Sequence, residues 1–267
     1  MPVALVTGAS SGIGEACAQR LVRSGWRVLA GVRRAGDAPP ETEEVLLDVT
    51  DSGQIADAAG RVDELDALVN NAGIALAVPL EFVPPDELRR QLEVNVVGQV
   101  AVTQAFLPQL RNARGRIVFI GSIAGRSALP FIGAYAASKH ALEAVADSLR
   151  LELRPFGVQV SIVEPGTIKT PIWMKAAAAA DELAQRLPAA LGELYGERID
   201  AFRQVALKRG TRGASPDDVA KAVEKALSAE RPQSRVLVGR DAKLRARLER
   251  LPDRLRDRVY ERILLRS

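Results

Sequence analysis

The sequence predicts an α/β fold, in which helices cover both faces of one doubly wound parallel sheet of about seven strands. Two observations lead to this fold class. First, short apolar, β-rich runs recur along the 267 residues, and a segment able to form a helix separates each run from the next. Second, runs such as RIVFI and VQVSIV are apolar or β-branched on both faces, as strands covered on both sides require.

Taken in chain order, the expected strands are 3–7, 26–32, 45–47, 67–70, 116–120, 159–164 and 235–238. Two helical segments stand outside this alternation. The segment 173–213 contains five consecutive alanines and several leucines, and it is too long for a simple crossover, so we expect an inserted helical lid. The segment 240–267 has leucines at three- or four-residue spacing, and Pro252 divides it into two amphipathic helices. We expect one domain over 1–267.

Composition and charge restrict the function classes. The single cysteine, Cys17, excludes an internal disulfide, and no run of 18 or more apolar residues occurs, so we expect a cytoplasmic protein without a membrane span. The formal charge is +4, yet residues 240–267 alone hold ten basic and five acidic residues. The basic character therefore belongs to the C-terminal segment, which argues against nucleic acid as a partner. A packed or dimerising helix suits this segment better than a membrane surface, because its apolar stripe lacks Trp and Phe.

The first strand leads into the glycine-rich stretch TGASSGIG, residues 7–14, and then into an expected helix. Glycines at 8, 12 and 14 allow a tight turn and close approach of the backbone to a ligand. The free N–H groups of the helix N-terminus suit the pyrophosphate of a dinucleotide, as in a Rossmann fold. Because the spacing is not G-x-G-x-x-G, the glycines alone leave an ordinary strand-to-helix turn open.

The glycine pattern and five further motifs, in this order, resemble the short-chain dehydrogenase/reductase family, over roughly residues 3–240, and in particular its retinol and hydroxysteroid dehydrogenase-like division. They are TGxxxGxG at 7–14, NNAG at 70–73, Asn95 in EVNVVG, Ser122 in GSIAG followed by YAASK at 135–139, and PGTIKT at 165–170. The resemblance implies a catalytic group of Asn95, Ser122, Tyr135 and Lys139. In that group Ser122 bonds the substrate oxygen, Lys139 bonds the nicotinamide ribose, and Asn95 holds a water that links Lys139 to solvent.

The pair Tyr135 and Lys139 makes chemical sense on its own. Residues four apart lie on one face of a helix, and an ammonium there favours the phenolate of a tyrosine, whose usual pKa is near 10. We therefore expect Tyr135 to act as a general acid and base in hydride transfer between a nicotinamide and a carbonyl carbon. The only histidine, His140, follows Lys139 and is expected off the catalytic face, and one His and one Cys give no support for a metal site.

The end of the second strand predicts the cofactor. An acidic residue there would accept hydrogen bonds from the adenosine ribose, but Val32 holds that position and Arg33 and Arg34 follow. Guanidinium suits phosphate, so we expect NADP(H), with Arg33 as the main contact and Ser11 assisting; a solvated arginine loop is the alternative. The resemblance implies that Asp48 and Val49 lie at the adenine and that Ile168 and Thr170 bond the carboxamide. The full expected cofactor set is Gly8, Ser10, Ser11, Gly12, Ile13, Gly14, Arg33, Arg34, Asp48, Val49, Asn71, Ala72, Gly73, Tyr135, Lys139, Pro165, Gly166, Ile168 and Thr170.

The apolar lid favours a hydrophobic alcohol or carbonyl substrate, such as a steroid, a retinoid or a bulky ketone. Two alternatives remain at this point: an NADP-binding sensor without turnover, and an NAD-dependent dehydrogenase of a small hydroxy acid. The resemblance also implies a homodimer or homotetramer formed through the helices that carry Asn95 and Tyr135.

Overall fold

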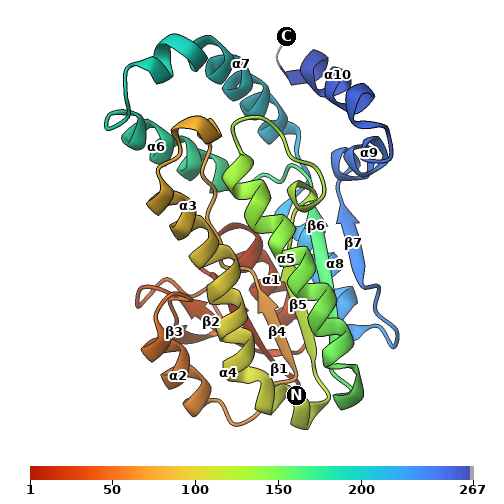
Figure 1. Cartoon of the computed structure of the whole chain (residues 1–267). Coiled ribbons are helices and arrows are strands. Elements are labelled where there is room, and N and C mark those ends of the chain that lie inside the picture. Colours follow the sequence, from red (N-terminus) through yellow and green to blue (C-terminus); the bar gives the residue numbers. More distant parts are fainter. Residues whose placement is uncertain (265–267) are drawn as a thin grey trace.

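The computed structural model describes residues 1–264, apart from the side chains of 207–209, 211, 212, 263 and 264. Its centre is a parallel seven-stranded sheet of order β3-β2-β1-β4-β5-β6-β7, which confirms the predicted fold class (Figure 1). The strands are β1 (Val3–Thr7), β2 (Arg27–Val32), β3 (Glu43–Leu46), β4 (Ala67–Asn70), β5 (Arg116–Ile120), β6 (Gln159–Pro165) and β7 (Arg235–Val238). The expected strands agree with these within two residues at each end. Because the order reverses between β1 and β4, a crevice opens there at the carboxyl ends of the strands.

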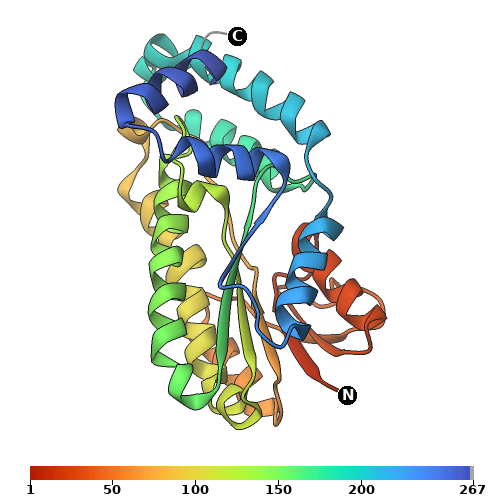
Figure 2. The ribbon, with the colours of Figure 1, turned by 90° about the vertical axis from the view of Figure 1, so that its right-hand side faces the viewer.

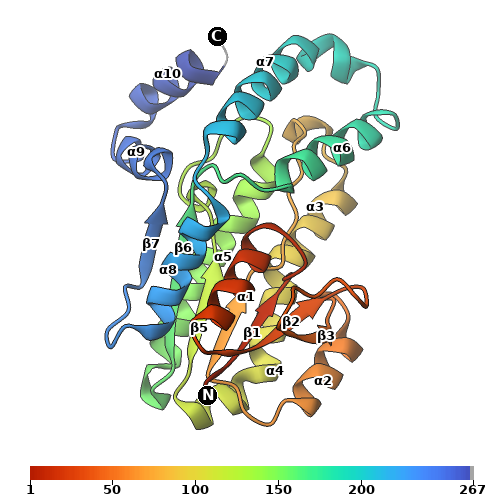
Figure 3. The ribbon, with the colours of Figure 1, turned by 180° about the vertical axis from the view of Figure 1, so that it is seen from behind.

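Helices cover both faces of this sheet. They are α1 (Gly12–Arg23), α2 (Ser52–Arg61), α3 (Pro85–Leu92), α4 (Gly98–Ala113), α5 (Gly133–Glu152), α6 (Ile172–Ala184), α7 (Ala190–Arg212), α8 (Pro216–Ser228), α9 (Arg240–Leu248) and α10 (Asp253–Leu264). Helices α2, α4 and α5 lie on the face seen in Figure 1, and α1 and α8 lie on the face seen from behind in Figure 3. The sheet is therefore buried on both sides, as its apolar strands predict.

Two apolar layers hold the sheet and its helices together. One joins β1, β2 and β4 to α1 and α8 through Ala4, Val6, Leu21 and Val223. The other joins the opposite face to α2, α4 and α5, and its largest fully buried side chains include Phe106 and Phe119. Cys17 is packed in the first layer, where burial raises the pKa of its thiol to about 12. It is a core residue and not a reactive thiol.

The remaining helices gather beyond the carboxyl ends of the strands. Helices α6 and α7 occupy the expected lid segment, and α9 and α10 follow β7 above the same end of the sheet (Figure 2). The expected C-terminal segment ran to 267, and its last three residues lie outside the described part of the chain. Among the described helices, none has the length and apolar character needed to cross a membrane.

Candidate active site

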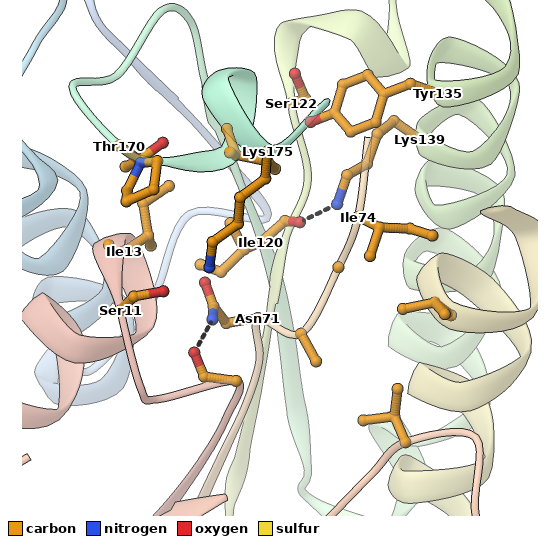
Figure 4. A pocket seen from close by; sticks show the side chains of 18 of the residues that line it. Ser11, Ile13, Asn71, Ile74, Ile120, Ser122, Tyr135, Lys139, Thr170 and Lys175 are labelled. Carbon is orange, nitrogen blue, oxygen red and sulfur yellow. Dashed lines mark hydrogen bonds between the residues drawn. The ribbon is translucent and has the colours of Figure 1, made fainter. Parts of the chain in front are cut away.

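A cavity of about 590 Å³ opens at the carboxyl ends of the central strands. The loops after β1 through β6 and the start of α6 line it, and Figure 4 shows how their side chains converge. It holds most of the residues that the sequence singled out: Gly8, Ser10, Ser11, Gly12, Ile13, Arg33, Asp48, Val49, Asn71, Ala72, Gly73, Ser122, Tyr135, Lys139, Pro165, Gly166, Ile168 and Thr170. Gly14, Arg34 and Asn95 are not among its lining residues.

The glycine-rich turn after β1 forms one wall of the cavity. Gly8 and Gly12 have φ of +63° and +64°, a region that L side chains rarely adopt. Gly14 serves packing instead, because a Cβ there would lie 2.3 Å from the Gly8 carbonyl oxygen. The N-cap of α1 is Ser11, whose side chain makes no capping hydrogen bond. The first N–H groups of α1 are therefore left for an anion.

The loop after β4 fastens this turn to the centre of the sheet. The Asn71 side-chain amide donates to the carbonyls of Thr7, at 2.9 Å, and Gly8, at 3.1 Å. In return, the Thr7 hydroxyl accepts from the backbone N–H groups of Asn71 and Ala72, both at 3.0 Å. The floor of the cavity is thus preorganised by the chain itself.

The end of β2 places one of the two predicted arginines in the cavity. Val32 is buried at the end of the strand, and Arg33, which follows it, is exposed and lines the cavity. Among the described residues, Arg33 has no carboxylate partner within ion-pair distance. Arg89 and Arg90 also line the cavity, but each pairs with an acid on α3. Arg33 is therefore the lining arginine whose charge is not already compensated by an ion pair.

Ser122 and Tyr135 both line the cavity and lie next to each other, as Figure 4 shows. Both side chains are nearly buried, at 8% and 6% exposure. The Ser122 hydroxyl also caps the turn that follows β5, because it accepts from the N–H of Ala124 at 3.1 Å. Burial raises the pKa of Tyr135, and the hydrogen bond with Ser122 and the charge of Arg245 oppose that rise.

Lys139 lies one helical turn after Tyr135, but it does not act on the phenol as the sequence predicted. Its ammonium donates to the Ile120 carbonyl at 2.7 Å, and it lies 5.9 Å from the centre of the Tyr135 ring. Burial lowers the pKa of Lys139 to about 8, against the opposing charge of Glu143. The expectation that this ammonium lowers the tyrosine pKa is therefore not met in this structure, where burial of Tyr135 dominates.

Asn95 is fully buried in a π-helical turn, η2 (Glu93–Val97), between α3 and α4. Its side chain accepts from the N–H of Ile74 at 2.8 Å and donates to the Ile74 carbonyl and the Ser138 hydroxyl, both at 3.0 Å. A π-turn frequently marks a functional site. Here it aims Asn95 at the loop after β4 and at the helix that carries Lys139.

Sequence reasoning missed several lining residues, namely Leu47, Thr50, Ile74, Arg89, Arg90, Glu93, Val94, Ile120, Pro171, Ile172 and Lys175. Leu47 directly follows β3, Arg89 and Arg90 lie on α3, and Pro171, Ile172 and Lys175 lie at the N-terminal end of α6. The start of α6 also brings in Trp173, whose ring meets that of Tyr135 edge-on at 5.7 Å. That contact joins two segments 38 positions apart, and sequence spacing alone does not show it.

The residues present fit a dinucleotide. The glycine turn leaves room where a Cβ would intrude, and α1 offers uncapped N–H groups. Arg33 adds a cation that has no ion-pair partner in the described part of the chain. Fold and site together define a doubly wound, dinucleotide-binding α/β protein. The family model of the short chain dehydrogenases matches residues 2–181, so the chain belongs to that family. It is an oxidoreductase family whose members bind a nicotinamide cofactor.

Individual relatives cover nearly the whole chain. A NADPH-dependent 3-dehydrocapnine reductase of Ornithobacterium rhinotracheale is 34% identical over 97% of this chain and 96% of its own. Retinol dehydrogenase 5 of Mus musculus is 39% identical over 90% of this chain and 81% of its own. Among solved structures, a short chain dehydrogenase of Burkholderia cenocepacia in complex with NADP has a TM-score of 0.75 and 30% identity, covering 98% of this chain and 97% of that one.

Proposed function

We propose that this protein is an NADP(H)-dependent oxidoreductase that interconverts a secondary alcohol and a ketone, or an alcohol and an aldehyde, on a hydrophobic substrate. The observation that carries the proposal is the convergence of Ser122, Tyr135 and Lys139 in one cavity with the glycine turn and Arg33. A proton donor and a nucleotide cradle in one enclosed space are what a hydride-transfer enzyme requires.

The preference for NADP(H) rests on the end of β2. Val32 stands in place of an acid, and Arg33 has no carboxylate partner among the side chains that the structure describes. This end of β2 therefore carries no negative charge that would repel a 2′-phosphate and one cation that attracts it. Gly8, Ser10, Ser11, Gly12, Ile13 and Asn71 to Gly73 would hold the pyrophosphate and its neighbouring sugars, and Asp48 and Val49 the adenine. The NADPH-dependent 3-dehydrocapnine reductase and the Burkholderia cenocepacia structure in complex with NADP support the same preference.

A bound nicotinamide supplies hydride to the carbonyl carbon, or accepts it in the reverse direction. Tyr135 gives a proton to the substrate oxygen in reduction and takes it back in oxidation. Lys139 holds a buried positive charge behind Ser122 and Tyr135, and its hydrogen bond to the Ile120 carbonyl fixes where that charge lies. Asn95 positions the helix of Lys139 through Ser138.

The surroundings of Tyr135 support an apolar substrate. Its ring packs with Ala75, Ala124 and Ile132, and Trp173 and Phe202 lie against the same cluster. Edge-on ring contacts continue the apolar surface from Phe131 to Phe202, at 5.5 Å, and from Phe131 to Tyr195 at 6.3 Å. Such a wall gains free energy by covering hydrocarbon and offers few partners to a sugar or a phosphorylated metabolite. The similarity to retinol dehydrogenases agrees with a hydrophobic substrate.

We also propose that the protein is cytoplasmic and that two or four copies assemble through α4 and α5, which lie side by side on one face of the molecule (Figure 1).

The proposal is tested by fluorescence titration with NADPH and NADH, followed by a panel of steroid, retinoid and small aromatic ketones read at the NADPH absorbance. We expect tighter binding of NADPH and turnover of a bulky ketone, with Tyr135→Phe as the inactive control. Binding without turnover across the panel would favour an NADP sensor. Absence of nucleotide binding would overturn the proposal.

A further inference from the structure

Two side chains of helix α9, one helical turn apart, contact two different loops of the active site. Asp241 and Arg245 are four residues apart and so lie on the same face of the helix. Figure 2 shows this helix crossing above the carboxyl end of the sheet.

Asp241 holds the loop that follows β6. One of its carboxylate oxygens accepts from the N–H of Thr167 at 2.7 Å. The loop comes so close that a Cβ at Gly166 would lie 2.2 Å from the other carboxylate oxygen. Pro165, Gly166 and the nearby Ile168 all line the cavity, so this carboxylate fixes part of its wall from behind.

Arg245 holds the loop that follows β5. Its guanidinium donates to the Ser127 carbonyl at 2.6 Å and to the Ser127 hydroxyl at 3.0 and 3.2 Å. Ser127 is fully buried, and its N–H donates to the Ile123 carbonyl within the short turn that begins at Ser122. A charged donor on a buried serine carbonyl is a strong bond, because little water competes for it.

Helix α10 completes this contact. The Tyr260 hydroxyl donates to a Glu249 carboxylate oxygen at 2.7 Å, so it must accept the proton of the Ser127 hydroxyl, 2.8 Å away. The Ser127 oxygen in turn accepts from Arg245. The bonds thus run in one direction, from Arg245 through Ser127 and Tyr260 to Glu249, and each member has its partner.

We propose that α9 is a two-point clamp on the active site, in which Asp241 and Arg245 are positioning residues for the nucleotide-binding loop after β6 and the Ser122 loop after β5. The functional names of the two loops rest on the proposed function, but the clamp itself rests on the hydrogen bonds described above. The charge of Arg245 also lowers the pKa of Tyr135, against the effect of burial. The basic C-terminal segment is therefore part of the catalytic architecture and not an appendage to it.

The test compares Asp241→Ala, Asp241→Asn and Arg245→Met with Arg247→Met, a control that removes an exposed arginine from the same helix. Hydrogen exchange in the full-length protein is followed in 122–128 and 165–170. We expect Arg245→Met to speed exchange in 122–128 by about tenfold, and Asp241→Ala to do so in 165–170. Asp241→Asn keeps an acceptor for the Thr167 N–H and should restore most of the protection. Arg247→Met should leave the exchange rate unchanged in both segments.

Two further readouts separate positioning from general stability. Asp241→Ala should raise the NADPH Kd about fivefold or more, and Arg245→Met should leave that Kd within twofold. In alcohol oxidation, where Tyr135 must lose its proton, Arg245→Met should move the pH midpoint of kcat to higher pH, and Arg245→Lys should move it less. If every variant showed the same exchange rates as the wild-type protein in both loops, the proposed clamp would be wrong. If wild-type protein bound no nucleotide yet showed the loop-specific exchange, the clamp would stand and the proposed function would fall.

Discussion

Replacing Arg33 with alanine should remove much of the preference for NADPH over NADH. The side chain lines the nucleotide cavity directly after β2 and has no carboxylate partner among the described residues. A charged hydrogen bond contributes roughly 1.5–3 kcal/mol, and we take the low end because Arg33 is exposed to solvent. About 1.5 kcal/mol corresponds to roughly a tenfold rise in the NADPH Kd. NADH lacks the 2′-phosphate, so its Kd should stay within about twofold.

The measurement is a fluorescence titration of each variant with both nucleotides at two salt concentrations. Arg34→Ala is the matched control, because Arg34 carries the same charge one residue later and does not line the cavity. The Arg33 effect should shrink at high salt, as expected for an exposed charge. Equal losses for NADPH and NADH, or the same loss for Arg34→Ala, would refute the assignment of Arg33 to the phosphate.

Three other substitutions test the site. Tyr135→Phe should lower kcat by about 100-fold or more, because it removes the general acid, and should leave the NADPH Kd nearly unchanged; retained turnover would exclude Tyr135 as the proton donor. Lys139→Met should raise the Tm at pH 7. The pKa of Lys139 is about 8 when folded and 10.5 ordinarily, so the unfolded chain binds more protons between these pH values and stability rises with pH there. The gain is at most roughly 3 kcal/mol below pH 8 and should vanish above about pH 10.5; a Tm difference independent of pH would contradict this sign. Gly14→Ala should lower the free energy of unfolding by about 1–3 kcal/mol and weaken nucleotide binding, because its Cβ would lie 2.3 Å from the Gly8 carbonyl oxygen and 2.4 Å from the Asn71 amide nitrogen. An unchanged Tm of Gly14→Ala would show that the glycine-rich turn can shift to make room for the added Cβ.

The sequence was most informative where the local pattern and the fold require the same thing. The strands from Val3 and from Arg116 could be placed to the residue, because a strand buried on both faces is apolar throughout and ends where polar or small residues begin. The glycines at 8 and 12 could be assigned a role because their conformation excludes other residues.

What could not be predicted depends on long-range geometry. Nothing near Lys139 in the chain indicates that its ammonium would donate to the Ile120 carbonyl, since Lys139 lies on α5 and that carbonyl belongs to β5. The expectation for the tyrosine pKa failed for the same reason, because the burial of Tyr135 depends on residues such as Trp173 from α6. The contact of Arg245 with Ser127 spans 118 positions, and a run of basic residues on an amphipathic helix gives no sign of it.

The π-turn at Glu93–Val97 makes the length of this segment a strict requirement. One residue added to or lost from a helix rotates everything beyond it by about 100°. Downstream, Gln99 bonds the Ala72 carbonyl at 2.7 Å, and Thr103 bonds the Asn70 side chain at 2.8 Å. A single-residue deletion here would turn both away from the strand end that they support. We therefore expect chains of this family to keep the same number of residues between Leu92 and Gly98.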